Sequence, residues 1–114
     1  MGFNFFRKRK TIEEEYKDAL NLAVQTFNNF PDLDLDFSDR QVNEIIIPRL
    51  NNLLVLEMRI ELQENDSKEE RTQRISLLSK VLDLKNADLH TREEMQRDWK
   101  VLKQLVIKRF NSLQ

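Results

Sequence analysis

Residues 42–62 read VNEIIIPRLNNLLVLEMRIEL, the most apolar stretch of this 114-residue chain. Its apolar side chains recur with spacings of three and four, which is the period of an α-helix rather than of a β-strand. Between Ile45 and Leu56 they occupy nearly the whole circumference of the helix, a distribution typical of an element that is buried on several sides. We therefore predict a helix over about 38–64 and expect it to be the most buried element of the fold.

Pro48 lies inside this predicted helix. Proline has no backbone N–H, and its ring clashes with the carbonyl group four residues earlier, which here belongs to Glu44. A kink at Pro48 is the expected result. A full break into two separate helices is the alternative, and the sequence leaves it open.

A further helix is predicted over 11–29. Thr11 and Glu14 have the spacing of a capping box, in which the hydroxyl and the carboxylate satisfy free N–H groups at the start of a helix. Apolar residues then follow at intervals of three and four. Pro31 ends the helix, because the residue before a proline is pushed away from helical backbone angles.

Two more helices are predicted in the second half of the chain, over 67–85 and 91–112. In the second of these the apolar residues, Trp99 among them, keep nearly heptad spacing, which places Trp99 in the predicted core. Four amphipathic helices joined by short connections are typical of a bundle. The sequence therefore predicts an all-α fold, an antiparallel four-helix bundle with residues 11–114 as its single domain.

The segment between the first two predicted helices is acidic. Apolar and acidic residues alternate from Asp32 to Phe37, which is the period of an extended chain. The aspartates begin like a calcium-binding loop, but an EF-hand needs glycine at the sixth position and glutamate at the twelfth, which here are Phe37 and Asn43. We expect an extended crossover whose acids Asp32, Asp34 and Asp36 contact a partner.

The composition excludes several classes of catalytic and cofactor-binding site. Gly2 is the only glycine, so the chain has no glycine-rich loop to hold a phosphate or a dinucleotide. It has no cysteine and one histidine, His90, and so neither a thiol nucleophile nor the Glu-x-x-His motif of di-iron bundles. A buried pair of carboxylates is not expected either, because glutamates such as Glu57 fall mostly between the apolar positions. We expect a non-enzymatic protein without cofactor or metal.

The charges of the chain are separated along the sequence, although they nearly cancel in total. The 19 basic and 20 acidic side chains give a formal net charge of −1. Residues 11–66 contain 13 acids and 4 bases, whereas residues 1–10 carry four bases and no acid. Separated charges suit helices that pair opposite signs, within one chain or across a dimer. Together with the apolar excess of the helix 38–64, they predict a protein–protein interaction module that forms a homodimer.

The N-terminal tail, residues 1–10, is a second candidate contact surface. Phenylalanines are followed there by four consecutive cations. Aromatic rings can enter the headgroup region of a bilayer while cations meet anionic lipid, at roughly 1 kcal/mol for each base. An N-myristoylation motif fails, because its sixth position needs serine or threonine. The candidate residues for membrane or partner contact are Phe3, Phe5, Phe6, Arg7, Lys8, Arg9 and Lys10.

This tail supports the alternative hypothesis of a peripheral membrane-associated regulator. No apolar run reaches the ~20 residues that span a bilayer, and the basic cluster follows the apolar residues instead of preceding them as in a secretory signal. We therefore expect a cytoplasmic protein, which the tail would bring to the inner face of the membrane. In size and helix number the chain is similar to small cytoplasmic bacteriocin-immunity proteins of Gram-positive bacteria. That resemblance implies a membrane-proximal regulatory role and carries over no residue.

A further alternative is a phage or plasmid accessory protein that contacts nucleic acid through the basic fourth predicted helix. Acids such as Glu93 and Glu94 dilute this basic surface, and the chain as a whole is not basic, so we do not expect nucleic acid as the partner. The basic residues concerned, on the third and fourth predicted helices, are Arg71, Arg74, Lys80, Arg92, Arg97, Lys100, Lys103, Lys108 and Arg109.

Overall fold

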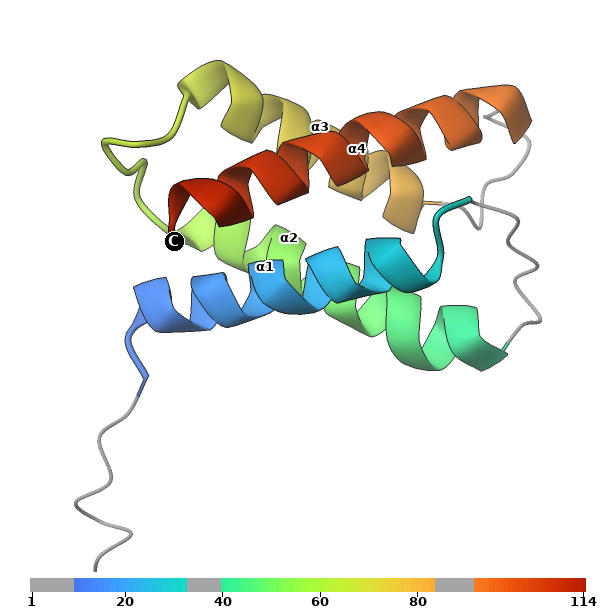
Figure 1. The fold of residues 1–114 in the computed structure, drawn as a ribbon, viewed down its shortest axis with the longest axis horizontal. Coiled ribbons are helices and arrows are strands. Elements are labelled where there is room, and N and C mark those ends of the chain that lie inside the picture. Colours follow the sequence, from blue (N-terminus) through green and yellow to red (C-terminus); the bar gives the residue numbers. More distant parts are fainter. Residues whose placement is uncertain (1–9, 33–39, 84–91) are drawn as a thin grey trace, which may run out of the picture.

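The computed structural model describes residues 10–32, 40–83 and 92–114, and this part of the chain is helical without any strand (Figure 1). Its elements are α1 (Ile12–Asn29), the π-helical segment η2 (Val42–Ile46), α2 (Ile47–Arg59), α3 (Lys68–Leu82) and α4 (Arg92–Ser112). The predicted all-α class is confirmed, as are four helices that pack against one another.

The four helices contact one another in a closed cycle. α1 packs against α2 and α4, and α3 packs against the same two helices. In Figure 1, α1 and α4 cross the view in front of α2 and α3. Each helix therefore has two neighbours and buries the sides that face them.

Trp99 of α4 is fully buried in the core that the helices enclose. Its ring meets Phe27 of α1 edge-on, with the ring centroids 4.6 Å apart. The indole N–H donates to the carbonyl oxygen of Phe30 at 2.8 Å, just beyond the end of α1. A buried indole needs such an acceptor for its N–H. The prediction that Trp99 is a core residue is confirmed, and its side chain joins α4 to the end of α1.

α1 begins at the cap that the sequence predicts. Thr11 has extended backbone angles, and its hydroxyl oxygen accepts a hydrogen bond from the N–H of Glu14 at 3.1 Å. The Thr11 hydroxyl in turn donates to the Glu14 carboxylate at 3.3 Å. The last helical residue is Asn29, two positions before Pro31. Both ends of this helix thus follow from local side-chain chemistry.

The second helix is less regular than the prediction over 38–64. Helical backbone continues without interruption from η2 to Arg59. At the end of η2 the N–H of Ile47 bonds to the carbonyl oxygen of Val42, one residue further back than in an α-helix. Pro48 follows directly and has no N–H to donate. The wider turn therefore lies where proline interrupts the α-helical hydrogen-bond ladder.

α2 ends at Arg59, whereas the apolar pattern predicts that it ends at about Glu64. Its cap residue, Ile60, has extended backbone angles. Arg71 of α3 donates to the carbonyl oxygen of Glu57 from Nε at 3.1 Å and from Nη2 at 2.6 Å, and Nη2 also donates to the carbonyl of Ile60. This guanidinium satisfies carbonyl groups that a helix end leaves without partners. The apolar spacing does not reveal this end of α2, because Ile60 and Leu62 continue the spacing beyond it.

Candidate functional site

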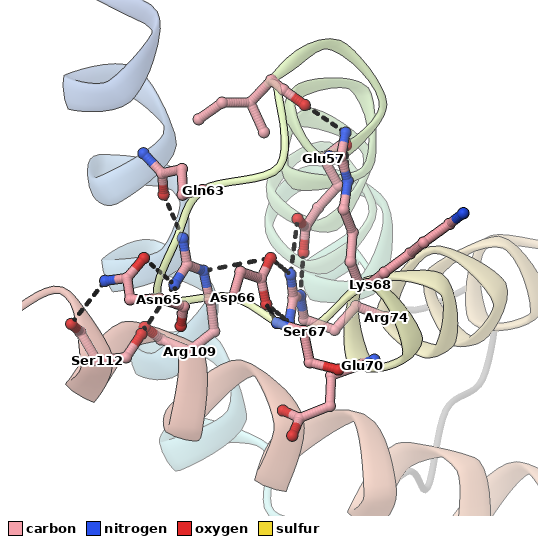
Figure 2. A network of polar contacts seen from close by, with 12 residues as sticks. Glu57, Gln63, Asn65, Asp66, Ser67, Lys68, Glu70, Arg74, Arg109 and Ser112 are labelled. Carbon is pink, nitrogen blue, oxygen red and sulfur yellow. Dashed lines mark hydrogen bonds and ion pairs between the residues drawn. The ribbon is translucent and has the colours of Figure 1, made fainter.

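A network of charged side chains fills the space between α2, α3, α4 and the α2–α3 connection, residues 60–67 (Figure 2). Arg74 of α3 is fully buried and donates to both oxygens of the Glu57 carboxylate, from Nη2 at 3.2 Å and from Nε. It also donates to the Asp66 carboxylate, at 3.1 Å from Nη1 and 2.6 Å from Nη2. One guanidinium thus links α2, the connection and α3.

Tyr16 of α1 contacts the same buried carboxylate. Its hydroxyl donates to Glu57 at 2.7 Å. Burial raises the pKa of Tyr16, and the negative charge of Glu57 raises it further. Burial alone would lower the pKa of Arg74, but hydrogen bonds to Glu57 and Asp66 outweigh this effect and raise it above its usual value. At neutral pH the tyrosine is therefore protonated and the arginine is charged.

Arg109 of α4 is the second buried arginine of the network. Its Nη1 donates to the side-chain oxygen of Asn65 at 3.1 Å and to the Ser112 hydroxyl at 3.0 Å, and its Nη2 donates to the side-chain oxygen of Gln63. Its Nε lies 3.7 Å from an oxygen of Asp66 and has no hydrogen-bond partner among the described residues. Arg109 thus attaches the α2–α3 connection to α4.

The buried carboxylates correct an expectation from the sequence. The side chain of Glu57 is 0% exposed and that of Asp66 is 6% exposed, so a buried carboxylate pair does exist. The prediction was wrong because it took Glu57 as a solvent-facing position between apolar ones. Buried charges are tolerated where they are paired and hydrogen-bonded, and Arg74 supplies both the charge and the donors.

The contacts of the network hold the helices together, and neither Tyr16 nor Arg74 has the properties of a general acid or base. A general acid or base needs a protonation state that changes near the working pH and access to a substrate. Tyr16 and Arg74 each keep one protonation state at neutral pH, and both are buried. What the arrangement does is to fix α1, α2, α3 and α4 relative to the connection.

A hollow of about 370 Å³ opens beside this network, at the start of α3 and the end of α4. Its lining mixes acids with bases, so it favours neither an anion nor a cation. The residues that line it are Glu64, Asn65, Asp66, Ser67, Glu70, Lys108, Arg109 and Ser112.

The basic surface considered for nucleic acid is smaller than the sequence suggests. Arg74 and Arg109 are 0% and 3% exposed, so their charges face the interior. Lys108 is exposed, but its ammonium group lies 2.5 Å from the Glu70 carboxylate. Electrostatic binding to a phosphate backbone needs cations that can reach the phosphates. Arg74, Arg109 and Lys108 instead form ion pairs within the protein.

Most of the contact residues predicted in the tail and in the acidic crossover lie outside the described part of the chain. Lys10 and Asp32 are described, and both are exposed. They flank opposite ends of α1, whose 18 residues span roughly 27 Å at 1.5 Å per residue, and do not form one site. The residues outside the description are Phe3, Phe5, Phe6, Arg7, Lys8, Arg9, Asp34 and Asp36.

Exposed apolar side chains gather on one side of α2. Val55 is 41% exposed, Met58 is 62% exposed, and Leu62, just beyond the helix, is 47% exposed. Val55 and Met58 are three residues apart, a spacing that places both side chains on a common helix face, whereas Leu62 follows Ile60, whose backbone is extended. The sequence predicts that this side of α2 is covered. It is not covered, because α2 contacts α1 and α3 on its other sides. We call Val55 and Met58 the outer face of α2.

No protein-family model, curated protein or solved structure matches the chain. Across residues 10–32, 40–83 and 92–114, none of the helices combines the length and the hydropathy needed to cross a bilayer. The same residues contain no group of three histidine or carboxylate side chains that could hold a metal ion.

Proposed function

We propose that the protein is a non-enzymatic protein–protein interaction module that self-associates through the outer face of α2. The observation that carries this proposal is the exposure of Val55 and Met58 on one side of α2, with Leu62 exposed just beyond the helix. An apolar helix face left in solvent is typical of a surface that packs against a partner. Methionine suits such a surface because its unbranched side chain adapts to the shape of what it contacts.

The scaffold in this proposal is an antiparallel four-helix bundle with a second helix that is kinked at Pro48. The closed cycle of helix contacts and the short α2–α3 connection support the bundle. The π-helical turn of η2 supports the kink, because both proline and π-turns are recurrent causes of sharp bends in helices.

A second copy of the chain is the proposed partner. A two-fold contact needs only one self-complementary patch, and an apolar face can pack on its own copy. Arg59 and Glu61 are exposed beside the outer face and carry opposite charges. In a two-fold arrangement, Arg59 of one copy can pair with Glu61 of the other at the rim of the apolar contact. Charged rims around an apolar centre are the usual anatomy of such interfaces.

Light scattering after size-exclusion chromatography tests this proposal on the full chain. The mass of the wild type should rise with concentration toward twice the monomer mass of 13.8 kDa. Met58→Glu places a charge in the contact and should remain at the monomer mass. The matched control is Val101→Glu on α4, where the side chain is 38% exposed, and this variant should associate as the wild type does.

Circular dichroism should give both variants the helical content and cooperative melting of the wild type. A wild type that stays at the monomer mass at every concentration contradicts self-association. If Met58→Glu and Val101→Glu weaken association equally, the contact does not use the outer face of α2.

A further inference from the structure

A groove of about 370 Å³ lies between the α2–α3 connection and the first turns of α3, and the surface that it exposes is mostly apolar. Leu62 of the connection and Ile75 of α3 supply apolar side chains. The aliphatic parts of Lys68, Arg71 and Thr72 add to them. Leu62 is 47% exposed, and Ile75 lies outside the core cluster. The groove is therefore apolar surface that the fold leaves open to solvent.

This groove adjoins the outer face of α2. Arg71 lines the groove, and its guanidinium donates to the carbonyl oxygens of Glu57 and Ile60, which flank Met58 in the sequence. Leu62, which also lines the groove, follows the last residue of α2 by three positions. Met58 itself does not line the groove, and its side chain is 62% exposed. A projecting apolar side chain and an open apolar groove therefore lie next to each other.

The outer face of α2 is too small to form a stable contact by itself. Stable interfaces bury about 800 Å² on each partner. Even a large aromatic side chain buries only about 150–250 Å², and Val55 and Met58 are two aliphatic side chains that are partly exposed. A contact through this face must therefore extend over neighbouring surface. The groove beside Met58 offers apolar surface for it, whereas the groove between α1 and α2 exposes more polar than apolar surface.

We propose that this groove receives Met58 of a second copy of the chain, so that each copy's Met58 packs into the groove of the other. The inference rests on the proposed self-association and names the surface that completes the contact. A two-fold contact uses the same patch on both copies, so a projecting side chain and the groove that accepts it must lie together on that patch. Methionine suits an irregular groove, because its unbranched side chain adapts to the available shape.

The same arrangement accommodates the charged rim of the contact. Two copies of a segment that run antiparallel across a two-fold axis place opposite each other those residues that are symmetric about one position. Arg59 opposite Glu61 of the other copy is such a pair, centred on Ile60. Met58 opposite Leu62 is centred on the same residue. One two-fold contact can thus pair the charges of the rim and bring Met58 to the edge of the groove.

Disulfide cross-linking of two different full-length chains tests the proposal, because the wild type has no cysteine. A disulfide needs Cβ atoms about 3.5–4.5 Å apart, so it forms between positions that come into contact. One chain carries Met58→Cys, and the other carries Thr72→Cys in the groove and a tag that changes its mass. We expect the mixed dimer to form several-fold faster than either dimer of like chains. The matched control is Gln73→Cys, the next residue of α3, which is exposed but does not line the groove and should cross-link several-fold more slowly.

A charge placed in the groove tests the same contact without altering the outer face of α2. Ile75→Glu should keep the mass in light scattering close to that of the monomer, because the charge would be buried against Met58 of the other copy. Ser76→Glu makes the same change at an exposed neighbour on α3 that does not line the groove, and it should associate as the wild type does. Melting curves followed by circular dichroism check that both variants are folded.

The outcomes distinguish a failure of this proposal from a failure of self-association. If two chains with Met58→Cys cross-link to each other fastest, the outer faces meet directly, so self-association stands and the groove proposal is overturned. Equal cross-linking rates for Thr72→Cys and Gln73→Cys also overturn it, as does an Ile75→Glu variant that associates like Ser76→Glu. A wild type that stays at the monomer mass at every concentration contradicts both proposals.

Discussion

Arg74 illustrates how a single side chain can define the relative position of several helices. It is fully buried and donates to carboxylates from α2 and from the connection that follows. A guanidinium presents its donors in a fixed plane, so the two carboxylates must lie in one geometry relative to α3. A shift of α2 along α3 would separate Glu57 from Arg74 and leave charges buried without partners.

The pairing can be tested by comparing a single variant with a double variant. Arg74→Met leaves Glu57 buried without its cation, and we expect the free energy of unfolding to fall by about 3–5 kcal/mol. Glu57→Met combined with Arg74→Met should lose less, because both buried charges are removed and Asp66 keeps its contact with Arg109. Urea unfolding followed by circular dichroism gives both values. A double variant as unstable as Arg74→Met alone contradicts this account.

Tyr16 makes the stability of the protein depend on pH in the alkaline range. Burial and the charge of Glu57 raise its pKa above the ordinary value of 10.0. Above that value the tyrosine ionises in the unfolded chain but stays neutral in the folded chain, so protons are lost preferentially from the unfolded state. The contribution is complete below pH 10 and declines above it, by at most about 1.4 kcal/mol per pH unit.

Tyr16→Phe tests this dependence. Unfolding free energies measured from about pH 8 to about pH 11 should decline less steeply for the variant than for the wild type. Lys10, whose pKa is also raised, contributes a decline of the same sign to both proteins and cancels in the comparison. Parallel curves for the two proteins would show that Tyr16 is not the source of the decline in stability.

At the scale of the element, Pro48 and η2 interrupt the regular hydrogen bonding of the second helix. Pro48→Ala restores an N–H that can donate to a carbonyl of the preceding turn. We expect the free energy of unfolding to rise by about 1 kcal/mol, the size of one added hydrogen bond. Hydrogen exchange at the new amide of position 48 measures the bond directly. Fast exchange there, with unchanged stability, would mean that the turn stays π-helical without proline.

The beginnings of α1 and α3 are predictable from the sequence, whereas the end of α2 is not. Thr11 and Ser67 cap their helices through the N–H groups of Glu14 and Glu70, three residues later in each case. A contact so local is visible in the order of residues. The end of α2 depends instead on Arg71, whose guanidinium reaches back eleven residues to the carbonyl of Ile60. The apolar periodicity of the second helix gives no indication of the contact with Arg71.

The same distinction separates the parts of the candidate site. Trp99 was placed correctly in the core, because a large apolar ring on an apolar face has one favourable environment. Glu57 and Arg74 were taken as surface residues, since charged side chains are seldom fully buried unless they are paired. Their pairing spans seventeen residues and depends on the rotation of α2 against α3. The exposure of Met58 depends on the same rotation.

For the molecule as a whole, Trp99 is a central contact of the core that the four helices enclose. It packs against Phe27 and binds the carbonyl of Phe30, so it joins α4 to α1. Trp99→Ala should lower the free energy of unfolding by about 3–5 kcal/mol through the cavity that it leaves. Trp99→Phe keeps most of the apolar contact and should cost less. Thermal melting followed by circular dichroism measures both; an alanine variant that melts like the wild type contradicts a core role.

The attachment of the α2–α3 connection to α4 also has a consequence for synthesis. A chain leaves the ribosome from its N-terminus, so the connection is made before α4. Arg109 follows Gln63 by 46 residues and Asn65 by 44, and these side chains cannot meet it until translation has passed that codon. Until α4 has been made, the acceptors of the connection lack the partner that they have in the folded protein. The cycle of helix contacts can therefore close only after α4 has left the ribosome.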